Sequence, residues 1–225
     1  MSAPVHLRPH ADVAERVLLP GDPGRALRLA QQVVDAPKML NHHRGLWGYT
    51  GIAADGEPLT IQSTGLGGPS TAIVAQELIA LGARRLVRVG TCGALIELPL
   101  GSLVIAGTVR AEDGASRALG AAGTLAPDPD LLAGLRAAGG HAAVGEVVSV
   151  DLYSDPGDWP GAVAVDLSAA ALLAVAAARH GAKAACVFAV SDVLGVERRR
   201  IDAEALERAE VELGRVAAAA LLARA

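Results

Sequence analysis

The segment Leu18-Leu19-Pro20-Gly21-Asp22-Pro23-Gly24-Arg25-Ala26 joins a short apolar run to a helical pattern. The apolar residues at its start predict a strand, and a proline suits the first turn of the helix that follows. A strand that passes through a glycine turn into a helix is the repeating unit of α/β folds. The segments Thr64-Gly65-Leu66-Gly67-Gly68-Pro69-Ser70 and Gly90-Thr91-Cys92-Gly93 are expected to be turns of the same kind. Because ligands of open α/β sheets bind at the carboxyl ends of strands, these turns are candidate walls of one site.

Further apolar runs and helical patterns alternate along the rest of the chain. The expected strands are Arg16–Leu19, Thr50–Ala54, Leu59–Ser63, Leu86–Val89, Ser102–Val109, Glu146–Val150, Ala162–Val165 and Ala184–Val190, and the expected helices are Pro23–Val33, Ser70–Leu81, Asp130–Ala138, Ser168–His180 and Ala203–Ala223. This order predicts one α/β domain over residues 1–225, with a mixed, largely parallel central β-sheet flanked by helices. The segment from Glu112 to Pro129, rich in Gly, Ala and Asp, is expected to be a long surface loop.

Composition narrows the class of function. The formal net charge is −4, and Lys and Arg do not cluster except at residues 198–200, which argues against a nucleic-acid or membrane-binding surface. Cys92 and Cys186 lie in apolar contexts without metal-ligand spacing, so we expect neither a disulfide framework nor a metal site. The N-terminus lacks the apolar core of a signal peptide, and no apolar run is long enough to span a bilayer. A cytoplasmic protein that acts on small molecules is expected.

Three arginines are candidates for binding an anion. Arg25 lies in the first turn of its helix, where free backbone N–H groups and the helix dipole favour negative charge. Arg88 interrupts an apolar strand, so its charge needs either a structural ion pair or an anionic ligand, and the neighbouring glycine turn favours the ligand. Arg44, in Asn41-His42-His43-Arg44-Gly45, is on its chemistry alone a solvated loop arginine.

Five strings of the sequence come in the order and spacing of a known family. They are Leu18 to Ala26, Arg44-Gly45-Leu46-Trp47-Gly48-Tyr49-Thr50-Gly51, Gly65-Leu66-Gly67-Gly68-Pro69-Ser70, Arg88-Val89-Gly90-Thr91-Cys92-Gly93 and Val190-Ser191-Asp192. On these motifs the chain resembles the bacterial purine nucleoside and uridine phosphorylases over nearly its whole length. The resemblance implies a partly barrel-like sheet and phosphorolysis of a nucleoside to free base and (deoxy)ribose 1-phosphate. Inorganic phosphate would be the co-substrate, without a cofactor or metal.

The resemblance also implies roles for individual residues. Phosphate would be held by Gly21, Arg25, Arg44, Arg88 and Thr91, ribose by His6, Asp166, Leu167 and Ser168, and the base by Cys92, Gly93, Tyr153, Val165, Ser191 and Asp192. Arg44 and His6 would reach into the site of a neighbouring subunit, in a homo-oligomer built from dimers and expected to be a hexamer. Judged without the family, His6 is a histidine of a disordered tail.

Asp192 is the expected catalytic residue. On its own, an acidic residue after the apolar strand Ala184–Val190 could equally form a turn or cap a helix. In purine-specific members of the family the matching aspartate is a general acid that protonates N7 of the base. Uridine-specific members carry a Gln-x-Arg pair in the loop that corresponds to residues 152–158, and this sequence lacks the pair. Both points favour a purine substrate over a uridine or broad-specificity activity.

The sequence departs from the family at the sugar. The family string Val-Glu-Met-Glu, whose second glutamate holds the ribose 2′- and 3′-hydroxyls, is here Val165-Asp166-Leu167-Ser168. Serine is short and neutral, so ribose binding should weaken unless Asp166 or a water substitutes. Three interpretations stay open, namely a differently hydroxylated sugar, a weakened paralogue that binds more than it catalyses, and a Ser168 that caps the following helix.

Another family feature has no clear match in the sequence. The arginine that pairs with the catalytic aspartate in purine enzymes could be any of Arg198, Arg199, Arg200 and Arg208. A hydrolytic nucleosidase of the same fold is disfavoured, because cleavage by water does not require the three phosphate arginines together.

Overall fold

The computed structural model describes residues 4–154, 157–179, 181–194 and 197–222. Its strands are β1 (Arg16–Pro20), β2 (Asp35–Asn41), β3 (Gly48–Ile52), β4 (Pro58–Gln62), β5 (Arg85–Ala94), β6 (Leu103–Ala111), β7 (Thr124–Leu125), β8 (Ala143–Ser149), β9 (Ala162–Asp166), β10 (Lys183–Val193) and β11 (Arg199–Arg200). Its helices are α1 (Pro23–Val33), α2 (Gly67–Ala80), α3 (Gly114–Ala118), α4 (Pro129–Ala138), α5 (Ala169–Ala177) and α6 (Ala203–Leu222), with one 3-10 turn at His43–Gly45.

All strands belong to one mixed sheet, in the order β11-β10-β6-β8-β9-β5-β1-β4-β3-β2, with β7 beside β6. The central strands β4, β1, β5 and β10 run parallel to one another. A further pairing between β10 and β5 closes β10, β6, β8, β9 and β5 into a five-stranded barrel. The expected α/β fold with a mixed, partly barrel-like sheet is therefore confirmed.

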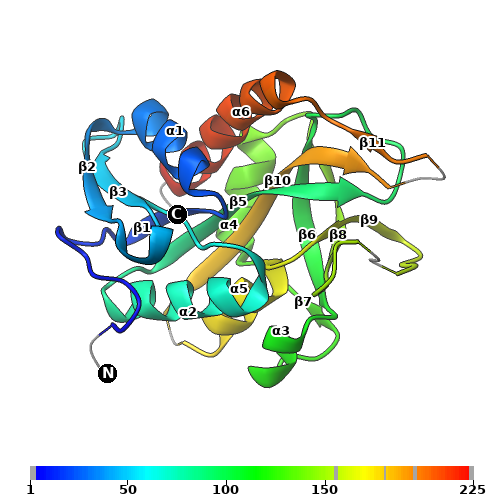
Figure 1. Ribbon diagram of the computed structural model, residues 1–225, viewed down its shortest axis with the longest axis horizontal. Helices are drawn as coiled ribbons and strands as arrows, with labels where there is room; N and C mark the ends of the chain where they lie inside the picture. Colours follow the sequence, from blue (N-terminus) through cyan, green and yellow to red (C-terminus); the bar gives the residue numbers. More distant parts are fainter. Residues whose placement is uncertain (1–3, 155–156, 180, 195–196, 223–225) are drawn as a thin grey trace.

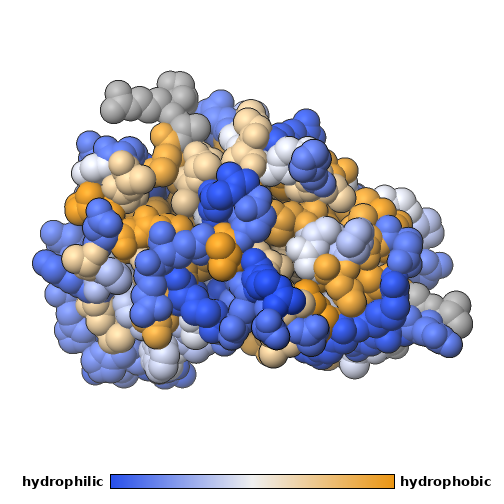
Figure 2. Space-filling view, turned by 90° about the horizontal axis from the view of Figure 1, so that it is seen from above, coloured by the Kyte–Doolittle hydropathy of each residue, from blue (hydrophilic) through white to orange (hydrophobic). Residues whose placement is uncertain are grey.

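Helices cover both faces of the sheet (Figure 1). Helices α1, α4 and α6 pack on one face, and α2, α3 and α5 on the other. Strand β1 serves both layers, because Leu18 joins the core under α1 and α6 while Val17 and Leu19 join the core under α2 and α5. Figure 2 shows the α1 and α6 side from above, where hydrophilic residues are spread between hydrophobic ones. Such a surface is typical of amphipathic helices whose apolar sides face the sheet.

The predicted turn at Gly90–Gly93 is wrong, because β5 continues in extended form to Ala94 beside β10. The glycines there make room for neighbouring side chains instead of turning the chain. A Cβ atom on Gly90 would lie 3.0 Å from the ring of Phe188, and one on Gly93 would lie 2.6 Å from the hydroxyl of Tyr153. Strand β10 likewise continues beyond Val190 to Val193. The polar residues at the ends of β5 and β10 are therefore part of the barrel wall and not of turns.

Other differences fall where the sequence lacks an apolar pattern. The expected loop between Glu112 and Pro129 contains α3 and β7, and α3 is capped by Asp113, whose carboxylate accepts from the backbone N–H of Ser116 at 2.8 Å. Strand β2 was not expected, since it is exposed over most of its length at the edge of the sheet. The expected helix ends His180 and Ala223 lie outside the described residues. No helix among the described residues is long and apolar enough to cross a membrane.

Candidate active site

A cavity of about 340 Å³ opens at the carboxyl ends of β5 and β10. Its lining residues are Leu66, Gly67, Arg88, Thr91, Tyr153, Asp166, Leu167, Ser191, Asp192 and Arg200. Seven of these are among the residues expected to bind phosphate, sugar or base, and they come from segments between positions 88 and 192. The chain therefore gathers predicted residues of all three kinds around one hollow.

Arg88 is a buried cation without a carboxylate partner among the described residues. Its Nε donates to the Ser168 hydroxyl at 2.9 Å and its Nη1 to the Leu19 carbonyl oxygen at 3.0 Å. The residue is only 7% exposed, and burial lowers the pKa of its guanidinium despite the charge of nearby Asp166. Of the two expectations for Arg88, the structural ion pair is therefore excluded within the described chain. A buried positive charge of this kind favours an anion in the cavity.

Arg25 lies near Arg88 but is balanced by a carboxylate that the sequence analysis did not identify. Its Nε donates to Glu210 of α6 at 2.7 Å, and Glu210 also accepts from Arg28. The backbone N–H of Arg25 is taken by Asp22, which caps α1 at 2.7 Å, so this N–H is not free for an anion as expected. Gly21 lies directly beside Arg88, since a Cβ atom there would be 3.3 Å from its Nη2.

Glu210 had one signal in the sequence, which is its place within the apolar stripe of α6 among Leu213 and Ala217. Replacement by glutamine is expected to lower the free energy of unfolding by roughly 3 kcal/mol, because two arginines would lose their buried counter-charge. Urea denaturation measures this loss. The matched control is Glu212→Gln on the same helix, whose partner Arg215 is exposed, so its loss should stay below about 1 kcal/mol. Equal losses in the two variants would contradict the structural role of Glu210.

Asp192 also lines the cavity and is 1% exposed. Its Oδ1 accepts from Arg198 Nε at 2.9 Å, and its Oδ2 accepts from the hydroxyls of Ser191 at 2.8 Å and Tyr153 at 3.1 Å. The structure thus selects Arg198 from the four arginines that the sequence left open. Asp192 lies within β10, so neither the expected turn nor the helix cap applies.

Tyr153 encloses the Asp192 side of the cavity. Its ring stacks under the guanidinium of Arg198 at 5.1 Å, and burial together with the charge of Asp192 raises the pKa of its hydroxyl, which stays protonated as a donor. Three other residues expected at the base, Cys92, Gly93 and Val165, are buried in β5 and β9 and do not line the cavity. Gly93 leaves the space that the Tyr153 hydroxyl occupies.

At the expected sugar end the polar groups are already engaged. Asp166 accepts from the Ser149 hydroxyl at 2.5 Å and from the backbone N–H groups of Ser168 at 2.9 Å and Ala169 at 3.0 Å. Ser168 is the first residue before α5 but makes no capping hydrogen bond with its side chain. Asp166 caps the helix instead, and the Ser168 hydroxyl accepts from Arg88. The carboxylate of Asp166 is thus already hydrogen-bonded within the chain, and Ser168 has no carboxylate with which to hold a ribose diol.

Comparison with known proteins identifies the family. Residues 15–224 match the model of the phosphorylase superfamily. The chain belongs to the phosphorylase superfamily. It is 35% identical over 196 residues to a purine nucleoside phosphorylase DeoD-type of Geobacillus kaustophilus, covering 80% of this chain and 82% of that protein. The relative of the same name from Jannaschia sp. is 36% identical over 203 residues, covering 83% and 85%, and that from Clostridium beijerinckii is 35% identical over 205 residues, covering 84% and 85%.

In this phosphorylase-superfamily chain, His6 and Arg44 lie outside the cavity of their own subunit. His6 is not part of a disordered tail, because Glu77 of α2 accepts from its ring Nδ1 at 2.8 Å and from the backbone N–H groups of Val5 and Leu7. Arg44 lies in an exposed turn with a left-handed backbone at φ 60°. Both side chains are therefore placed on the surface of the subunit.

The N-terminal anchor predicts a pH dependence. Burial alone would raise the pKa of Glu77, but the N–H groups of residues 5–7 and the His6 ring outweigh it, so the pKa lies below its ordinary value of 4.5. A lowered pKa means that the anchoring is complete above about pH 4.5 and is lost as the pH falls through the pKa of the anchored state. Hydrogen exchange at residues 5–7 measures this release. Glu77→Gln should remove the pH dependence, and protection that stays constant in the unmodified chain would contradict it.

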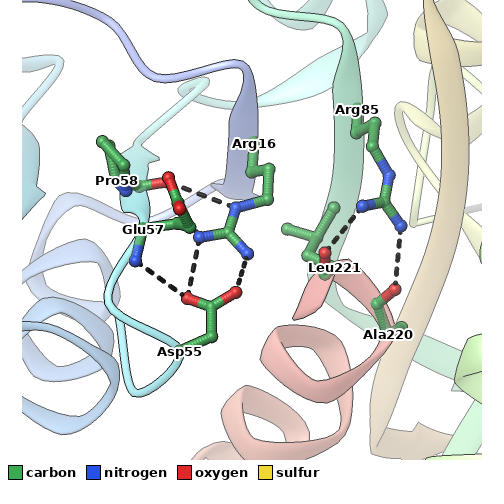
Figure 3. Close-up of polar contacts among 7 residues, drawn as sticks. All are labelled: Arg16, Asp55, Glu57, Pro58, Arg85, Ala220 and Leu221. Carbon is green, nitrogen blue, oxygen red and sulfur yellow. Dashed lines mark hydrogen bonds and ion pairs between the residues drawn. The ribbon is translucent and has the colours of Figure 1, made fainter. Parts of the chain in front are cut away.

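A larger cavity, of about 570 Å³, lies at the opposite ends of β1 and β5. Figure 3 shows why its arginines do not form an anion site. Arg16 binds Asp55 through both terminal nitrogens, at 2.6 and 3.0 Å, and this lowers the pKa of Asp55 to about 2. Arg85 donates to carbonyl oxygens of the last turn of α6. These contacts join β1 and β5 to a loop and to the C-terminal helix. The two arginines of this cavity therefore stabilise the fold.

Proposed function

We propose that the chain is a purine nucleoside phosphorylase, which uses inorganic phosphate to split a purine nucleoside into free base and (deoxy)ribose 1-phosphate. The observation that carries the proposal is Arg88, a buried guanidinium without a carboxylate partner at the cavity that also holds Asp192. Family membership and the names of the relatives support the same activity. The negative charge of phosphate supplies the counter-charge that the Arg88 guanidinium lacks. Arg25 and Gly21 lie beside this guanidinium.

The proposed chemistry asks for little covalent help from the protein. A phosphate oxygen attacks C1′ of the sugar, the bond from C1′ to the base nitrogen breaks, and its electron pair leaves with the base. Arginine donors fix the phosphate in line for attack. At the base, Asp192 gives a proton to N7, and the ionised carboxylate that results is stabilised by Arg198 and by the Tyr153 hydroxyl.

We further propose that neighbouring subunits complete the site, through Arg44 at the phosphate and His6 at the sugar. The exposed large apolar side chains support an association surface near both residues. They include Val5, Met39, Trp47, Leu66 and Ile73, which belong to the N-terminal segment, β2, the loop before β3, the N-cap of α2 and α2 itself. Oligomerisation as a dimer-based hexamer would bury them. Sedimentation of the purified chain tests this proposal, and a monomer at working concentration would refute it.

The activity is tested by incubating the full chain with inosine, guanosine, adenosine or uridine, with and without phosphate, and measuring base release. Phosphate-dependent release from at least one purine nucleoside is expected. Release of uracil alone would replace the purine substrate by uridine, and release without phosphate would replace phosphorolysis by hydrolysis. No release from any of the four would reject the enzyme function.

A second candidate is a nucleoside-binding protein with little turnover. It is favoured by the sugar end, where Asp166 is used by the backbone of α5 and Ser168 by Arg88. Calorimetry with inosine and 2′-deoxyinosine separates the two candidates. A binder would take up nucleoside with phosphate present and release no base, whereas the enzyme would release base from either sugar.

A further inference from the structure

The three consecutive arginines at 198–200 do not form one solvated face. In the antiparallel pair of β10 and β11, Asp192 lies opposite Arg200 and Val193 lies opposite Arg199. Side chains directly opposite each other point to the same side of a sheet, and successive residues point to opposite sides. Arg199 accordingly pairs with Glu97, away from the cavity, while Arg200 lines the cavity with Asp192.

Arg200 also differs from Arg198 in the contacts of its guanidinium. Arg198 is held by Asp192 and by the ring of Tyr153, but the guanidinium of Arg200 makes no hydrogen bond or ion pair within the described part of the chain. A guanidinium carries only donors and keeps its charge at all working pH values. The cavity therefore presents two neighbouring groups of opposite character, namely the carboxylate of Asp192 and the donors of Arg200.

Resting on the proposed purine activity, we infer that Arg200 recognises the oxygen at C6 of the base, so that 6-oxopurine nucleosides are preferred to adenosine. The N7 atom and the C6 substituent are neighbours on one edge of a purine. Guanine presents two acceptors there, whereas adenine presents an acceptor and an amino donor. With Asp192 at N7, its cross-strand neighbour Arg200 faces the C6 substituent, and a group with donors alone pairs with an oxygen and not with an amine.

The inference also explains how Arg200 would affect the rate. When the bond to the sugar breaks, its electron pair moves into the base, and part of the negative charge reaches the C6 oxygen. A fixed cation beside this oxygen stabilises the transition state more than the bound substrate. Adenine has no such oxygen, so adenosine would not gain from Arg200.

The experiment compares Arg200→Ala and Arg200→Gln with the matched control Arg199→Ala. In Arg200→Ala we expect kcat/KM for inosine to fall by about 10- to 100-fold, as for one lost charge-assisted hydrogen bond, and kcat/KM for adenosine to change by less than about 3-fold. Arg200→Gln should raise the ratio of adenosine to inosine, because an amide can also accept from an amino group. Arg199→Ala should leave both substrates unchanged.

Binding of free hypoxanthine and adenine, measured by calorimetry, gives a readout without turnover. Weaker binding of hypoxanthine but not of adenine in Arg200→Ala would support the assignment. Equal losses for both bases, or a preference of the unmodified chain for adenosine, would overturn the role of Arg200 and leave phosphorolysis standing. If the unmodified chain cleaves neither nucleoside, the proposed function fails instead.

Discussion

Replacement of Arg88 by methionine is expected to lower phosphate-dependent base release by about 10²–10³-fold, the cost of removing one preorganised donor from a transition state. The same change should leave the protein without phosphate at least as stable as before. Arg88 is buried without a carboxylate partner in the described chain, and burial of such an ion costs several kcal/mol. The carbonyl of Leu19 would lose its donor, at a cost of about 1–3 kcal/mol. We expect the gain from removing the buried charge to exceed this loss in the free energy of unfolding.

Two measurements check the expectation for Arg88. Steady-state kinetics at varied phosphate give the loss of kcat/KM, and urea denaturation without phosphate gives the change in stability. Arg110→Met is the matched control, because Arg110 is also a strand arginine but pairs with Glu146 away from the cavity. Its phosphate kinetics should not change. A large loss of stability in Arg88→Met, with unchanged kinetics, would show that Arg88 is structural.

Asp192→Asn is expected to lower turnover of inosine by about 10²–10⁴-fold, the usual contribution of a general acid. Asparagine keeps the shape of the side chain but has no carboxyl proton to give to N7. The KM for phosphate should stay the same, because in the proposed chemistry Asp192 acts at the base and Arg88 at the phosphate.

A substrate that needs no proton provides the control. In 7-methylinosine the base already carries a positive charge at N7, so its cleavage should be nearly equal in Asp192→Asn and in the unmodified chain. Initial rates of base release with both nucleosides measure the difference. If the variant loses the same factor with 7-methylinosine as with inosine, Asp192 does not act as the acid.

The sequence predicted local features well where a pattern repeats within one segment. Helix α1 spans Pro23–Val33 as expected, because its proline, its cap and its amphipathic face all lie in the same short stretch. The turn expected at Gly90–Gly93 was wrong for the opposite reason. Glycine is used there for close approach to Phe188 and Tyr153, and no pattern within the strand reveals what lies above it.

The candidate site likewise contains features that the local sequence predicted and features that it did not. An arginine within an apolar strand indicated that Arg88 needs either an ion pair or an anionic ligand, and the order of the motifs indicated where Asp192 would lie. Its partner Arg198 could not be chosen from the sequence, because three consecutive arginines and then Arg208 follow Asp192 without a clear register. The bulge of β10 between Val190 and Asp192 and the pairing with β11 decide the register.

The sequence by itself determined the alternation of the main buried strands and helices, the family motifs and the two charged residues on which the proposed chemistry depends. These follow from neighbours in the chain, whose spacing directly fixes which side chains share a strand or helix face. Only the tertiary structure joined Arg25 to Glu210, 185 residues away, closed the barrel and turned Arg200 toward the cavity. Such contacts depend on packing and strand register between distant segments, and no local pattern records them.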